Sequence, residues 1–188
     1  MKTKYSLDEY NNLEKKYGFY SSWAIWNEEY PSDTSVIKDN LNDLNTKYVF
    51  LALNISAPLK KKWGNFHGGK HDRKLVKSCN KTKLRGSYIT DIFKGIVDAD
   101  SSALKNLPED VIKKNVDFFH EEMRDIKIDS DTTFIILGTE SSLVSKYFNK
   151  YFQQGYDNKV INYYHYSYYT LTDIEWVEGL LREVESGE

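Results

Sequence analysis

The sequence predicts a three-layer α/β/α fold built on a short, mainly four-stranded parallel sheet. Apolar, β-branched and aromatic runs bounded by polar segments indicate buried strands at residues 47–53, 87–93, 132–137 and 159–164. Helical patterns separate these runs, and such alternation gives a parallel sheet that is covered on both faces. With 188 residues and 40% hydrophobic content, the chain is expected to form a single domain over residues 1–188.

The expected helices have start signals as well as apolar stripes. The capping signals are Ser6 with Glu9, Thr139, and Thr172 with Glu175. Pro108 marks the entry of the clearest helix, in which apolar residues recur every three or four positions. That stripe consists of Ile112, Val116, Phe119, Met123 and Ile126. A further short helix is expected at residues 72–79, inside the long connection between the first two strands.

Cysteine content and hydropathy predict a soluble, cytoplasmic protein. Cys79 is the sole cysteine, so the sequence offers no internal disulfide and no cysteine-based zinc or iron–sulfur site. Residues 1–20 contain no apolar run suited to a signal peptide or a membrane span. We expect no cofactor, no metal and no membrane partner, and we expect a monomer. His67 and His71 are four apart, but the two glycines between them disfavour a helical pair of metal ligands.

Positive charge is concentrated in the long connection. Residues 60–85 hold ten Lys and Arg residues and one acid, Asp72, whereas the formal net charge of the whole chain is -2. Two interpretations of this cluster stay open, a solvated loop face and a phosphate-binding surface.

Polar and aromatic residues follow each expected strand. In open parallel sheets, ligands bind beyond the carboxyl ends of the strands. The segments at these positions are residues 53–56, 90–91, 138–139 and 165–169, together with the loop at residues 63–67. We therefore expect a reactive pocket at this edge of the sheet.

Motifs in these segments resemble, in the same order, those of the uracil-DNA glycosylase superfamily. Ala-Leu-Asn-Ile-Ser at residues 52–56 is similar to the Gly-Ile-Asn-Pro-Gly of its mismatch-specific branch, and Gly-Asn-Phe at 64–66 to its Gly-Asn-Arg-Phe element. Tyr-Ile-Thr-Asp at 88–91 resembles Tyr-Ile-Thr-Asn of one branch, and His-Tyr-Ser-Tyr at 165–168 resembles the last motif, His-Pro-Ser followed by a wedge residue. The resemblance spans about residues 47–169 and implies a uracil-DNA glycosylase-like fold.

The resemblance also implies an activity, that of a DNA glycosylase in DNA repair. Such a hydrolase binds nucleic acid, extrudes a base from the duplex and hydrolyses its N-glycosidic bond. Asn54 would position the attacking water, and His165 would hydrogen-bond the base carbonyl, where negative charge gathers. The reaction needs a placed water and hydrogen-bond donors more than a strong nucleophile.

The other matching positions would hold the base and the strand. The base-binding positions are Ile55, Ser56, Phe66 and Asp91, and Phe66 would stack on the ring. The positions for phosphate contact or for a wedge are Ser167, Tyr168, Lys61 and Lys62, with Tyr169 as an alternative wedge.

The chain departs from the family pattern at several of these positions. Ile55 and Tyr166 replace the prolines of the first and last motifs. Asp91 stands where the family has an Asn that reads uracil through a donor and an acceptor. An ionised Asp only accepts, which suits an amino group or a ring N–H, so the base is left open and need not be uracil.

Less specific interpretations of the same residues also stay open. Asn54 is equally suited to form a turn, His165 to be a hydrogen-bonded structural histidine, and Phe66 to cover the core. Two other functions therefore remain as alternatives. One is a non-catalytic protein that binds a base, a nucleotide or nucleic acid in the same pocket, and the other is a protein-interaction module on the tyrosine-rich segment at 163–169.

Overall fold

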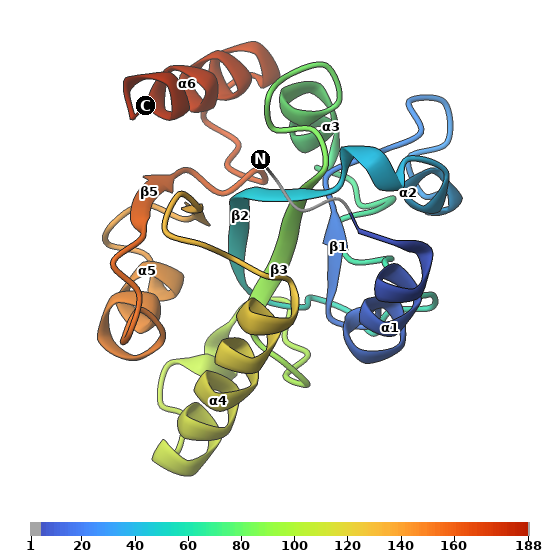
Figure 1. Cartoon of the computed structure of the whole chain (residues 1–188). Helices are drawn as coiled ribbons and strands as arrows, with labels where there is room; N and C mark the ends of the chain where they lie inside the picture. The colour runs from blue at the N-terminus through green and yellow to red at the C-terminus, as the bar shows by residue number, and fades with distance from the viewer. Residues whose placement is uncertain (1–4, 188) are drawn as a thin grey trace.

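The computed structural model describes residues 5–187 and contains a five-stranded mixed sheet in the order β1-β3-β2-β4-β5 (Figure 1). The strands are β1 (Ser21–Trp23), β2 (Asn45–Asn54), β3 (Ser87–Phe93), β4 (Thr133–Leu137) and β5 (Lys159–Tyr163). The α/β class is confirmed, and β2 to β5 are the four predicted strands, all parallel to one another. The expected number of strands was too low, because β1 adds a fifth, antiparallel to β3. With three residues, two of them serine, β1 shows no apolar run.

Six α-helices are found among the described residues. They are α1 (Leu7–Tyr17), α2 (Ser35–Asp39), α3 (Arg73–Cys79), α4 (Glu109–Asp125), α5 (Leu143–Tyr147) and α6 (Asp173–Ser186). Short 3-10 turns occur at Leu41–Asp43 and Ser102–Leu104, and α5 continues as a π-helical turn at Phe148–Phe152. In the part of the chain that the structure describes, no helix combines the length and the apolar character needed to cross a membrane.

The helix boundaries follow the capping signals except at α5. Capping boxes are present at the start of α1, between Ser6 and Glu9, and at the start of α6, between Thr172 and Glu175. The prediction of Thr139 as a cap was wrong. Ser142 caps α5 instead and accepts from the Ser145 N–H at 3.3 Å, whereas the Thr139 hydroxyl lies 3.2 Å from that of Ser141.

A hydrophobic core lies on each face of the sheet, which gives the three layers of Figure 1. The first core joins the sheet to α1, α4 and α5, and the second joins it to α3 and α6. Side chains of a strand point alternately to its two faces. In β2, Val49 and Leu51 accordingly enter the first core, while Phe50 and Ala52 enter the second.

The four parallel strands are not equally buried. Every residue of β3 is buried, but β5 runs from an exposed Lys159 to a buried Tyr163. The expectation of four buried strands was wrong for β5, because β5 is an edge strand whose neighbour in the sheet is β4 alone.

The topology opens a crevice at the carboxyl end of the sheet. From β2 the chain passes to β3 on one side, and from β4 it passes to β5 on the other side. The two connections therefore diverge between the neighbouring strands β2 and β4. Such a switch point is where open parallel sheets bind ligands.

Candidate functional site

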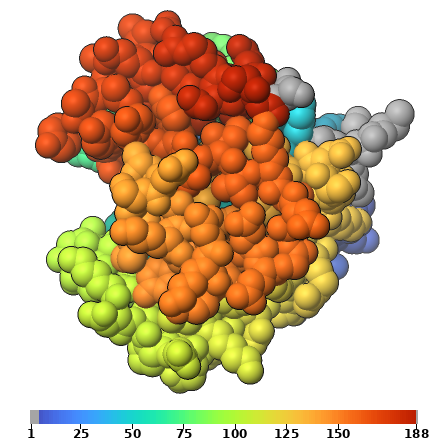
Figure 2. Space-filling model, turned by 90° about the vertical axis from the view of Figure 1, so that its left-hand side faces the viewer, coloured from blue at the N-terminus to red at the C-terminus, as the bar shows by residue number. Residues whose placement is uncertain are grey.

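A cavity of about 600 Å³ lies at the carboxyl ends of β2 to β5. In Figure 2 the surface is indented between the yellow-green residues that follow β3 and the orange-red residues that follow β5. Most of the predicted site residues line this cavity, namely Asn54, Ser56, Phe66, Asp91, His165 and Ser167. A larger hollow of about 710 Å³ follows the open edge of β5 and α6, but none of the predicted site residues lines it. The candidate site is therefore the cavity at the strand ends.

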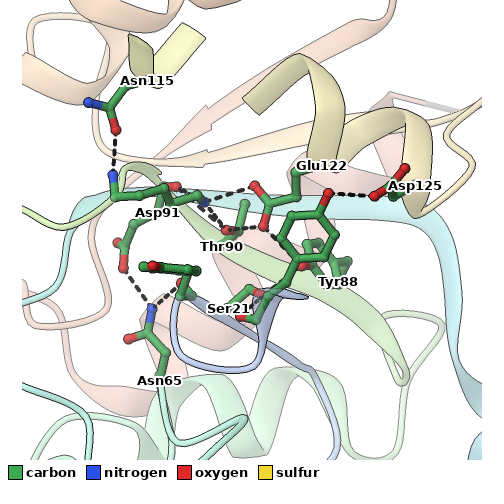
Figure 3. A network of polar contacts seen from close by, with 11 residues as sticks. Ser21, Asn65, Tyr88, Thr90, Asp91, Asn115, Glu122 and Asp125 are labelled. Atoms are coloured by element: carbon green, nitrogen blue, oxygen red, sulfur yellow. Dashed lines mark hydrogen bonds and ion pairs between the residues drawn. The ribbon is translucent and has the colours of Figure 1, made fainter. Parts of the chain in front are cut away.

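Asp91 supplies a buried carboxyl group to the cavity wall. Its side chain belongs to β3 and is 1% exposed. Oδ2 of Asp91 accepts from Nδ2 of Asn65 at 2.6 Å (Figure 3), and none of the residues 5–187 is seen to donate to Oδ1. Burial raises the pKa of Asp91 from 3.8 to about 6, and the Asn65 hydrogen bond and the nearby Lys94 oppose that rise. The group is thus mainly ionised at pH 7 and able to change its charge near pH 6.

A buried polar network supports Asp91 from the opposite face of β3. Nζ of Lys94 lies 2.8 Å from Oε2 of Glu122 and also contacts the backbone carbonyl of Asp91. Oε1 of Glu122 accepts from the hydroxyl groups of Tyr88 and Thr90, both at 2.9 Å (Figure 3). The network fixes the backbone at the end of β3 and hence the position of the Asp91 carboxyl group.

His165 presents a neutral ring to the cavity. Its Nδ1 accepts from the backbone N–H of Ser167 at 3.2 Å and lies 2.7 Å from the Ser167 hydroxyl. Because a backbone N–H can only donate, Nδ1 carries no proton, and the proton of the neutral ring is on Nε2. Burial lowers the pKa of His165 from 6.5 to about 4, so the ring is neutral at pH 7. The histidine therefore offers one N–H donor and no charge.

Phe66 is held in an unusual backbone conformation at the cavity wall. Its φ of 64° lies in the left-handed region, which is uncommon for residues other than glycine. Nε1 of Trp26 donates to the Phe66 carbonyl at 2.9 Å, and the Tyr166 ring packs edge-on at 6.1 Å between centroids. These two contacts hold the strained residue so that its ring lines the cavity.

Asn54 uses its amide group mainly to hold the loop between β3 and α4. Nδ2 donates to the backbone carbonyls of Ile55, Ile96 and Asp98 at 3.0, 3.3 and 2.8 Å. Oδ1 accepts from the Ser101 hydroxyl at 3.3 Å, which leaves one lone pair of that oxygen. The NH₂ group is thus committed to the fold, and Oδ1 alone retains hydrogen-bonding capacity toward the cavity.

The structure does not bring the other four predicted residues to the cavity wall. Lys61 contacts the backbone carbonyl of Ser32, and Lys62 pairs with Glu14 of α1 at 3.7 Å. Ile55 is buried beside the wall, and Tyr168 stacks on Tyr164 with centroids 4.8 Å apart. Tyr169, by contrast, is 93% exposed.

Ion pairs neutralise much of the cationic cluster at residues 60–85. Arg73 and Lys77 pair with Asp173 at 2.5 and 3.2 Å, Lys81 pairs with Glu28, and Arg85 pairs with Asp43. These acids come from distant parts of the chain, so the local charge count overstated the positive field of this surface. Lys70 is the member of the cluster that lines the cavity.

Three further cavity residues were given no role in the site by the sequence. Asp72 is buried, accepts from the Gly69 N–H at 2.7 Å, and has a pKa raised by burial. Tyr166 stands where the last motif of the similar family has a proline, and its ring packs against both Phe66 and His165. Asn65 was noted only as part of a motif, although its place beside Phe66 was a usable signal.

The two histidines of the long connection do not face one another. His67 stacks on Trp26 with centroids 5.0 Å apart, and its Nε2 lies 3.3 Å from the Ile25 carbonyl. His71 lines the cavity instead. Within residues 5–187 no group of three or more His, Cys, Asp and Glu side chains is arranged to hold a metal ion.

Comparison with known proteins assigns no family to the chain. No protein-family model, no curated protein and no solved structure matches the chain. The function of the cavity is therefore inferred from its own residues.

Proposed function

We propose that the chain is a uracil-DNA glycosylase-like hydrolase that binds an extruded nucleobase and hydrolyses its N-glycosidic bond. The observation that carries this proposal is the convergence of Asn54, Phe66, Asp91 and His165 on one cavity. They come from four separate segments of the chain, and each belongs to one of the four motifs that resemble the family. A planar base between Phe66 and the opposite wall would meet the Asp91 carboxylate at one edge and His165 at another.

Each side chain has a role in the hydrolysis. As the bond between C1′ and the base breaks, its electron pair moves to the base, and Nε2–H of His165 stabilises that charge without giving up its proton. A water molecule then adds to C1′, and the proton it loses ends on the departing base. Oδ1 of Asn54 has one lone pair with which to orient that water.

Further groups in and beside the cavity fit a nucleic-acid strand. Ser167 and Lys70 line the cavity and supply a hydroxyl group and a cation for phosphate oxygens. The Tyr169 ring is exposed a few residues further along the same segment and is positioned to fill the gap that an extruded nucleotide leaves.

Incubation with oligonucleotides that carry uracil, hypoxanthine or mismatched bases, followed by alkaline cleavage of abasic sites, tests the proposal. We expect release of at least one base, and we expect His165→Phe to slow release by about 100-fold to 1,000-fold, the usual effect of losing one such donor. His120→Phe is the matched control, because His120 lies on α4 and bonds the Phe152 carbonyl away from the cavity. No release of any base with enzyme in excess would contradict hydrolysis.

Non-catalytic base binding is the second candidate, and the Asn54 geometry favours it. The NH₂ group of Asn54 is held by backbone carbonyls, so this residue has little freedom to follow a reacting water. A base or nucleotide that raises the melting temperature without being cleaved, with the shift lost in Phe66→Ala, would support this candidate over hydrolysis.

A further inference from the structure

Asp91 is a buried group of the cavity whose hydrogen bonding is incomplete. One carboxylate oxygen, Oδ2, is satisfied by Asn65, while Oδ1 receives no hydrogen bond from any described residue. The side chain is 1% exposed, so bulk water solvates it poorly. A buried carboxylate with an open oxygen is costly unless a donor completes it. Since Asp91 lines the cavity, a bound ligand is the natural source of that donor.

Asn65 adds a second acceptor at the same wall. Two hydrogen bonds fix the orientation of its amide group. Nδ2 donates to Oδ2 of Asp91 at 2.6 Å and to the Tyr20 carbonyl at 3.0 Å. Each hydrogen of the NH₂ group is thus used, and Oδ1 remains as an acceptor to which none of residues 5–187 donates. Asn65 also lines the cavity, so Asp91 and Asn65 together form an edge that accepts and does not donate.

His165 adds a hydrogen-bond donor to these two acceptors. Its Nδ1 is occupied by Ser167, so Nε2–H is the donor that it offers to the cavity. A ring that satisfies all three residues needs neighbouring N–H donors on one edge and a carbonyl acceptor next to them.

We infer that the cavity selects a guanine-class ring, whose ring N–H and exocyclic amino group donate to Asp91 and Asn65 while its carbonyl accepts from His165. This inference rests on the proposed base-binding function. Hypoxanthine keeps the ring N–H and the carbonyl but lacks the amino group, so one acceptor stays unpaired. Uracil has a carbonyl on each side of its N–H, and one of them would face the carboxylate. Sites built around buried hydrogen-bonding groups discriminate strongly against ligands that leave those groups unpaired.

Titration of guanosine, inosine, cytidine and uridine into the intact protein, followed by calorimetry, tests the selectivity. We expect guanosine to bind most tightly, inosine about tenfold more weakly and uridine at least about 100-fold more weakly. Asp91→Asn introduces a donor, so it should weaken guanosine binding by about tenfold or more and strengthen uridine binding. Asp43→Asn is the matched control, since Asp43 pairs with Arg85 at the other end of the sheet.

The wild-type protein gives a second measurement that needs no variant to fold. Protonation of Asp91 turns part of its accepting edge into a donor, so guanosine affinity should fall as the pH drops through about 6. The charged and polar groups that act on Asp91 are Asn65, Lys94 and Glu122, with Tyr166 on the cavity side. Asp72, whose pKa is also raised by burial, lines the same cavity, so Asp72→Asn is the control that assigns the pH dependence to Asp91. His165 stays neutral over that range, because burial holds its pKa near 4.

The outcomes separate the two proposals. If uridine binds the wild type as tightly as guanosine, and Asp91→Asn leaves that ranking unchanged, the guanine inference is overturned while base binding stands. If no nucleoside binds at millimolar concentration, and no base is released from any oligonucleotide, both the inference and the proposed function are overturned.

Discussion

Lys94 and Glu122 form an ion pair inside the protein, with 2.8 Å between Nζ and Oε2 and with 6% and 0% of their side chains exposed. Lys94 follows β3, and Glu122 lies on the inner face of α4. The pair therefore joins the strand that carries Asp91 to the helix that covers the opposite face of the sheet.

Removal of one member of this pair should destabilise the fold. Lys94→Met leaves a buried carboxylate without its cation, and we expect the free energy of unfolding to fall by about 3–5 kcal/mol. The double variant Lys94→Met with Glu122→Met should recover a large part of that loss, because no charge is then left unpaired. Urea unfolding of the two single variants and the double variant measures the coupling. Strictly additive losses would contradict a direct interaction.

Lys74 should position the segment that carries His165. Its Nζ donates to the backbone carbonyls of Tyr168 and Leu171 at 2.7 and 2.9 Å, and its side chain is buried. Lys74→Met should increase hydrogen exchange at residues 165–171 and weaken nucleoside binding by about tenfold, since two bonds to a charged donor are lost.

Lys77→Met is the matched control for Lys74. Lys77 lies on the same helix but pairs at the surface with Asp173 at 3.2 Å. We expect no change in binding from this control, because surface pairs contribute little. Equal exchange rates at residues 165–171 in Lys74→Met and the wild type would show that Lys74 does not hold the segment.

His67 should make the protein sensitive to acid. Burial lowers its pKa from 6.5 to about 3; the nearby charge of Lys61 adds to this lowering, and that of Asp33 opposes it. Below pH 6.5 the unfolded chain binds a proton at this ring and the folded protein does not, so stability is lost as the pH falls from 6.5 toward 3. His67→Phe keeps a ring against Trp26 and should flatten that slope by up to about 1.4 kcal/mol per pH unit. Urea unfolding of the wild type and of His67→Phe at pH 7, 5.5 and 4.5 measures this slope. The same pH dependence of the unfolding free energy in both proteins would contradict the expectation.

The protonation of His165 can be observed directly. Nitrogen-15 NMR of imidazole-labelled protein should place the proton on Nε2 at pH 7 and show no titration until the pH approaches about 4. Ser167→Ala removes the hydroxyl near Nδ1 but keeps the backbone N–H, so the same tautomer should persist. A proton on Nδ1 in the wild type would contradict the assigned role as an N–H donor.

The sequence predicted the central sheet well because strands that are packed on both faces are rich in apolar residues. Each of β2, β3 and β4 is a run of apolar residues within a residue or two of its observed bounds. The first strand was missed for a physical reason, since Ser21 and Ser22 are buried through hydrogen bonds rather than through apolar surface. Glu122 was missed for a related reason, because an apolar stripe on α4 does not reveal a carboxylate that is buried by pairing.

The sequence predicted where the candidate site lies better than it predicted the contacts that the site residues make. Asn54, Asp91 and His165 converge because parallel strands end at one edge of a sheet, which a strand pattern already implies, whereas Phe66 reaches the cavity from the long connection after β2. The partners of Lys62 and Arg73 are Glu14 and Asp173, which are distant in the sequence, and no local charge count includes them. The commitment of the Asn54 amide to Ile96 and Asp98 likewise depends on how a loop folds back.

The cavity wall is assembled from residues between Ala52 and Ser167, so no short stretch of the chain contains the site. A fragment cut between the second and fourth strands lacks part of the wall and divides both cores. Two such halves produced separately should regain ligand binding only when they reassociate. This makes the protein suited to split-chain complementation, in which a bound base would report that the halves have come together.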